Sequence, residues 1–175
     1  MNKTIALALF FFAWSSLVHA QPQSESRTLR VHVNVEPIFV VQVAPRAGGE
    51  TIEFGTVKKE DQKSAQAEPV QVDIAVFSNL GVPYQVSQTV AGPLVNEKGE
   101  TLPLENFLIR ADEAVYGTGS ILNPEPVVAR EQLLFESNAN GDTDTFTANY
   151  LLQIPPTQAG GDYQMNIIYT IATKE

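Results

Sequence analysis

Residues 28–36, with the sequence TLRVHVNVE, alternate without a break between apolar and polar side chains. A period of two places the apolar side chains on one side of an extended chain, which predicts a half-buried β-strand. The apolar positions are Leu29, Val31, Val33 and Val35. Pro37 ends the run, because proline cannot donate a hydrogen bond to a neighbouring strand. Such a strand pairs either within its own domain or with another molecule, and the two cases predict different functions.

Short runs of the same kind follow along the chain, separated by Gly, Pro, Asn and Asp residues. They predict strands at 28–36, 38–43, 52–57, 70–76, 84–90, 107–109, 132–135, 146–154 and 163–171, and a hairpin that joins 94–95 to 101–102. These are about eight or nine short strands, and no segment has a convincing helical period. The pattern predicts an all-β fold, a single Ig-like β-sandwich with Greek-key connections, over residues 28–175.

The first twenty residues are typical of a secretory signal peptide. Lys3 is followed by the apolar run IALALFFFAW at 5–14, and Val18-His19-Ala20 is a small-residue cleavage site, so we expect cleavage before Gln21. The apolar run is short for a membrane span of about 20 residues. We therefore expect export through Sec to the periplasm, the cell surface or the medium, with no membrane span in the mature chain. Residues 21–27 (QPQSESR) are predicted to be a flexible polar N-terminus.

The chain is acidic and lacks cysteine. It has 11 basic and 20 acidic residues, and removal of Lys3 leaves 10 basic ones, a formal charge of −10. A chain of this charge is a poor ligand for nucleic acid, so we expect none as a partner. Disulfides are excluded, although exported proteins meet an oxidising compartment. Stability must therefore come from packing and strand pairing.

Residues suited to catalysis are sparse. His32 is the only histidine after the predicted signal peptide. One histidine cannot build a multi-histidine metal centre. A phosphate-binding loop of this kind needs a helix that begins directly after it, and no helix is predicted. No pair of carboxylates stands out as the acid and base of a glycosidase. We therefore expect no enzyme activity.

One loop has the residues of a cation site. Oxygen-bearing side chains alternate around Gly141, in the pattern that Ca²⁺ prefers. They are Asn138, Asn140, Asp142 and Asp144. The other interpretation is a turn in which Asn and Asp cap their own backbone. Apart from this ion we expect no cofactor.

Aromatic residues on the predicted strands allow a second ligand hypothesis, a platform for sugars. The candidates are Tyr84, Tyr116, Phe135, Tyr150, Tyr163 and Tyr169. Most of them fall on the apolar side of a strand, which favours packing in the core.

The two ends of the chain resemble those of bacterial fimbrial subunits. One feature is the alternating segment that runs into Pro37, and the other is the AGGDY turn at 159–163 before the last predicted strand. The absence of cysteine is similar to the alternate-chaperone class of fimbriae. The resemblance implies an incomplete Ig-like sandwich that receives its missing strand first from a periplasmic chaperone, at an usher, and then from the neighbouring subunit. Leu29, Val31, Val33 and Val35 would be the donated side chains.

Two interpretations of function therefore stay open. The first is an exported structural protein, a fimbria-like subunit that polymerises by β-strand addition. The second is a self-contained periplasmic or extracellular binding module whose first strand pairs within its own sheet. Residues 52–57 and 78–86 also resemble secreted domains of the WxL-like kind, although no Trp-x-Leu motif is present.

Overall fold

The computed structural model describes residues 29–58, 63–111 and 114–174, and it is all-β. Within these ranges a single 3₁₀ turn, Leu104–Asn106, accompanies seven strands of five to eleven residues and five strands of two residues. The strands are β1 Phe39–Pro45, β2 Ala65–Gln66, β3 Val70–Ser78, β4 Tyr84–Val90, β5 Leu94–Val95, β6 Thr101–Leu102, β7 Phe107–Ala111, β8 Thr118–Gly119, β9 Glu125–Pro126, β10 Gln132–Glu136, β11 Asp144–Ile154 and β12 Ile167–Thr173. The predicted fold class is confirmed.

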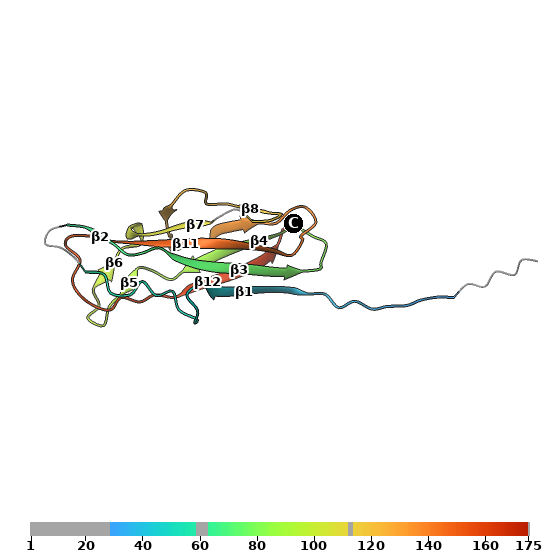
Figure 1. The fold of residues 1–175 in the computed structure, drawn as a ribbon, viewed down its shortest axis with the longest axis horizontal. Coiled ribbons are helices and arrows are strands. Elements are labelled where there is room, and N and C mark those ends of the chain that lie inside the picture. Colours follow the sequence, from blue (N-terminus) through green and yellow to red (C-terminus); the bar gives the residue numbers. More distant parts are fainter. Residues whose placement is uncertain (1–28, 59–62, 112–113, 175) are drawn as a thin grey trace, which may run out of the picture. The chain divides into compact units, whose positions relative to one another are not determined.

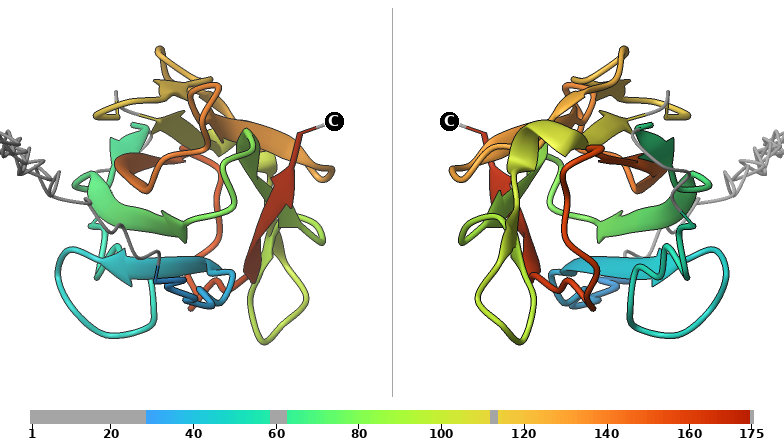
Figure 2. Two further views of the ribbon diagram at one scale, coloured as in Figure 1. Left: turned by 90° about the vertical axis from the view of Figure 1, so that its right-hand side faces the viewer. Right: turned by 90° about the vertical axis from the view of Figure 1, so that its left-hand side faces the viewer.

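Two antiparallel sheets form the sandwich (Figure 1). One has the order β1-β3-β11-β7-β9, with β2 beside the end of β11, and the other has the order β12-β4-β10-β8. From β3 onward each successive long strand lies in the opposite sheet, so the connections cross between the layers (Figure 2). The pair β5–β6 forms a separate hairpin, as predicted, with Gly99 at a positive φ of 80° in its turn.

The core lies between the inner sides of the two sheets. In β3 the apolar side predicted from the sequence is covered, because Val72, Ile74 and Val76 are fully buried. Aromatic rings fill the space between the layers, with Phe135 stacked on Phe146 at 4.8 Å between ring centroids. Burial of an aliphatic side chain such as Val72, Ile74 or Val76 contributes about 1.5–3 kcal/mol. Packing can therefore stabilise this chain without disulfides.

The predicted strand at 28–36 is not observed. Thr28 lies outside the described residues, and 29–36 form no strand. Leu29, Val31, Val33 and Val35 are 89%, 90%, 77% and 72% exposed. The alternation is present, but an extended segment becomes a strand only when another segment receives its backbone hydrogen bonds. The chain divides into two units, 1–34 and 35–175, and the first strand of the sandwich begins only at Phe39.

Two further strand predictions were wrong, one entirely and one in its first residue. Residues 52–57 form no strand, and Gly55 has a positive φ of 64° that interrupts an extended chain. The last strand begins at Ile167 rather than at Tyr163. Its partner β4 ends at Val90, opposite Ile167, so residues 163–166 lie beyond the end of this strand pairing.

The predicted signal peptide at 1–20 and the polar segment at 21–27 lie outside the described residues. Within the described ranges, no helix has the length and apolar character needed to cross a membrane.

Candidate functional site

A groove of about 1560 Å³ opens at one edge of the sandwich. The strands β1 and β12 lie at this edge, one at the end of each sheet (Figure 2). In the described residues β1 pairs with β3 alone and β12 pairs with β4 alone. The outward-facing edge of each strand therefore keeps backbone N–H and C=O groups available for another strand.

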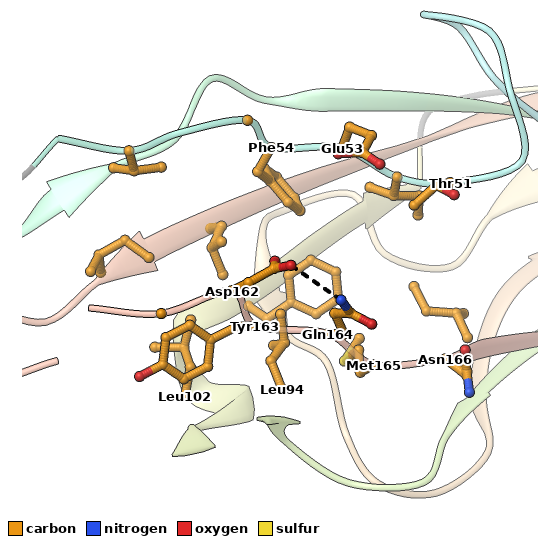
Figure 3. Close-up of a pocket in the computed structure, with 18 of the residues that line it drawn as sticks. Thr51, Glu53, Phe54, Leu94, Leu102, Asp162, Tyr163, Gln164, Met165 and Asn166 are labelled. Carbon is orange, nitrogen blue, oxygen red and sulfur yellow. Dashed lines mark hydrogen bonds between the residues drawn. The ribbon is translucent and has the colours of Figure 1, made fainter. Parts of the chain in front are cut away.

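The base of the groove is apolar. Buried side chains from β3, β7 and β11 of one sheet and from the β5–β6 hairpin reach it, so the groove opens directly onto the hydrophobic core (Figure 3). They are Val72, Leu94, Leu102, Phe107 and Leu152. Among the described residues no element covers this apolar base, and apolar surface without cover favours association.

One wall is the segment 51–57, which follows β1. Ile52, Phe54 and Val57 are half-buried and line the groove. Phe54 extends from this segment into the groove (Figure 3) and makes an edge contact with Phe107, at 5.9 Å between ring centroids. This wall is therefore held by side-chain packing rather than by a strand ladder.

The other wall runs from Asp162 into β12. Tyr163, Met165, Ile167 and Tyr169 line the groove, and the even-numbered residues between 162 and 170 are exposed. Gln164 exchanges two backbone hydrogen bonds of 3.0 Å with Val95, which ties this wall to the hairpin. The alternation predicted from the sequence thus continues beyond the strand, and its apolar side faces the groove.

A buried polar network borders the groove. The Tyr150 hydroxyl donates to Gln88 Oε1 (2.6 Å) and lies 2.7 Å from the Tyr169 hydroxyl. Gln88 Nε2 donates in turn to Gln132 Oε1 (2.9 Å). Burial raises the pKa of Tyr169 to about 12 and that of Tyr150 well above its ordinary value, so both hydroxyls stay protonated over the physiological range.

The predicted calcium loop is held by its own hydrogen bonds. Asp144 is buried, and its carboxylate accepts backbone N–H groups from Val115, Tyr116 and Gly117 at 2.7–3.0 Å. Asn138 Nδ2 donates to Asp142 Oδ2 (2.7 Å). The arrangement brings Asn138 and Asp142 together and directs Asp144 elsewhere, while Asn140 is exposed. The described residues contain no group of three or more His, Cys, Asp or Glu that could hold a metal ion, and calcium binding here stays a prediction.

The aromatic candidates do not form one platform. Tyr84, Phe135 and Tyr150 are buried in the core, as the core interpretation expected, and Tyr116 is exposed. Tyr163 and Tyr169 line the groove. The groove could not be recognised from the sequence, because 52–57 and 163–166 have the alternation of strands, and only the structure shows that neither is part of a continuous strand ladder.

No protein-family model and no curated protein matches the chain. Among solved structures, a family 123 glycoside hydrolase from Clostridium perfringens, studied for glycolipid glycan hydrolysis, superposes with a TM-score of 0.45 and 12% sequence identity. The match covers 76% of this chain and 25% of that one, so the chain spans a quarter of the length of the hydrolase. A similarity at this level assigns no activity to the chain.

Proposed function

We propose that this chain is an exported structural subunit, similar to a fimbrial subunit, that polymerises by β-strand addition. One observation carries the proposal: the same chain contains an exposed alternating segment, 29–35, and a groove with an apolar base, and in the described residues no other element covers either of them. The side chains Leu29, Val31, Val33 and Val35 of one copy would fill the groove of the next copy. The role is structural rather than catalytic.

The chemistry of the two surfaces supports this pairing. A strand beside β12 would receive hydrogen bonds from an edge that pairs with nothing else in the described residues. Every second side chain would then reach the apolar base, where a branched aliphatic residue contributes about 1.5–3 kcal/mol on burial. Four such residues make a strong interaction even after the cost of ordering the segment is subtracted.

The geometry of donation explains why a polymer would form. The donor segment and the groove are different surfaces of the chain, so the contact is heterologous and does not close on itself. Each added copy still offers one free end of each kind. We propose a periplasmic chaperone as the second partner. By placing one of its own strands in the groove, it would keep an exported subunit from associating too early.

The test compares the chain from Gln21 with a chain that begins at Pro37. We expect the longer chain to form SDS-resistant ladders, and the shorter one to stay monomeric and to melt at a higher temperature when a peptide of residues 26–36 is added. A peptide with Val31→Asp and Val33→Asp should have no effect. A longer chain that stays monomeric at all concentrations would exclude polymerisation and favour the self-contained binding module.

A matched pair of groove variants locates the binding surface. Met165 lines the groove, whereas Ile168 is 64% exposed on the opposite side of the same region of the chain. We expect Met165→Asp to abolish the stabilisation by the peptide and Ile168→Asp to leave it unchanged. Equal loss in both variants would show that the peptide does not bind in the groove.

A further inference from the structure

The backbone directly after the donor segment, residues 29–35, is held by the side chain of Asn79. Asn79 Nδ2 donates to the Glu36 carbonyl (2.8 Å), and the Ile38 N–H donates to Asn79 Oδ1 (2.7 Å). The Asn79 N–H also donates to the Ile38 carbonyl (3.2 Å). Ile38 and Asn79 thereby extend the register in which Phe39 pairs with Ser78. Residues 36–38 therefore continue the direction of β1.

This direction matters because the groove begins beside β1 itself. Val43 and Pro45 line it, so a segment that enters the groove from the start of β1 runs along the free edge of that strand. For the chain's own residues 29–35 to do so, the backbone would have to reverse between Val35 and Phe39. Only the three residues 36–38 are available for that reversal.

The three residues are poorly suited to a hairpin loop. Three-residue hairpins usually have a type I turn followed by a residue in the left-handed region. Glu36 precedes a proline, which disfavours the helical region that a type I turn needs. Ile38 is β-branched and would have to take the left-handed conformation, which is a genuine outlier for such residues.

We propose that Asn79, together with Pro37, is a positioning element that opposes insertion of residues 29–35 into their own groove and so reserves the groove for a second copy. The inference rests on the proposed function, and it addresses the choice between self and neighbour. A chain that can fill its own groove stops growth as a monomer. Reversal would break both hydrogen bonds of the Asn79 side chain, and removal of that side chain lowers the barrier to self-insertion.

The test uses the chain from Gln21 with Val31→Cys, since the protein contains no other cysteine. This background is compared with added Asn79→Ala, with added Pro37→Gly and with both. Asn79 and Pro37 are exposed, so neither change disturbs the core. Asn138→Ala is the matched control, because the Asn138 side chain also makes two hydrogen bonds, both to Asp142, at 2.7 and 3.2 Å. The monomer share is measured by light scattering, and the thiol of the isolated monomer by its rate of modification.

We expect the double variant to raise the ratio of monomer to polymer about tenfold, since two net hydrogen bonds favour the unreversed chain. The thiol of that monomer should be protected, whereas the thiol of the Val31→Cys monomer should react freely. Asn138→Ala should change neither quantity. A merely structural role for Asn79 would lower stability and leave the thiol reactive.

Three results overturn the inference. Polymers that form as before in the double variant sink it and leave the proposed function intact. A Val31→Cys monomer whose thiol is already protected shows that the wild-type sequence at 36–38 permits self-insertion. A chain from Gln21 with Val31 unchanged that stays monomeric at all concentrations refutes the proposed function, and the inference fails with it.

Discussion

Two segments of this chain have the same pattern and opposite environments. Residues 29–35 and residues 70–76 both place an aliphatic side chain at every second position. In β3 those side chains are covered, and the strand is paired with β1 on one side and β11 on the other. In 29–35 they are exposed and no strand forms. A period of two thus identifies which side of a segment is apolar, but not whether anything covers that side.

The largest effect on the free energy of unfolding is expected from substitutions on the apolar side of β3. Ile74→Ala in β3 should lower the free energy of unfolding by about 2–5 kcal/mol, because it leaves a cavity among fully buried neighbours. Val33→Ala should change it by less than about 0.5 kcal/mol in the monomer, because no packed contact is lost. Urea denaturation of the chain from Gln21, at a concentration where it is monomeric, measures both. Equal losses in the two variants would show that 29–35 is packed against the domain.

Much of the covered region could be predicted because its signals are local. The runs at 70–76, 84–90 and 146–154 alternate cleanly and end at Asn, Gly or Pro residues, and all three are strands. The environment of 29–36, 52–57 and 163–166 could not be predicted in the same way. It depends on where the neighbouring strands end, and that information lies elsewhere in the chain. Two of these segments, 52–57 and 163–166, lie in the walls of the groove, which is why the candidate site was recognised only from the structure.

Asp144 provides a second test of this comparison, because it is a buried charged residue within the covered part of the chain. It lies opposite Val76 at the start of β11, and its carboxylate accepts the N–H groups of residues 115–117. Asp144→Asn should cost about 1.5–3 kcal/mol, since an amide replaces one charged acceptor oxygen with a donor. Thermal or urea unfolding measures the loss.

The control is Asp142→Asn in the same loop. Asp142 is exposed and its carboxylate bonds to Asn138, so this change should cost less than about 1 kcal/mol. A similar loss in both variants would mean that the loop acts as a unit rather than through the buried carboxylate.

High pH should destabilise the covered region. Tyr150 lies opposite Val70, and Tyr169 and Tyr84 also belong to paired strands. Burial raises the pKa of Tyr84 and of Tyr169 to about 12 from the ordinary value of 10.0. Above pH 10 the unfolded chain loses these protons while the folded chain keeps them, so the stability is complete below pH 10 and declines toward pH 12. Residues 29–35 contain no tyrosine.

Urea midpoints measured from pH 9 to pH 12 should fall over the upper part of this range. Tyr169→Phe should make the decline shallower, because one of the groups is removed. A midpoint that stays constant to pH 12 would contradict the burial of these hydroxyls.

The smallest effect should come from the polar side of the covered segment. Arg46 Nη2 lies 2.5 Å from Asp73 Oδ1, and both side chains are about half exposed, 53% and 47%. The hydrogen bond from Arg46 lowers the pKa of Asp73 below its ordinary value of 3.8. The pair therefore stabilises the fold above that pH and loses its contribution as the pH falls through the lowered value.

Exposed pairs contribute less than about 1 kcal/mol, so Asp73→Asn should cost no more than this at pH 7. The difference between variant and wild type should shrink as the pH falls below 3.8 and also in 1 M salt, where the screening length is about 3 Å. A cost above about 2 kcal/mol that neither acid nor salt removes would exceed what an exposed pair supplies, and would place part of the stability of β3 in its polar side.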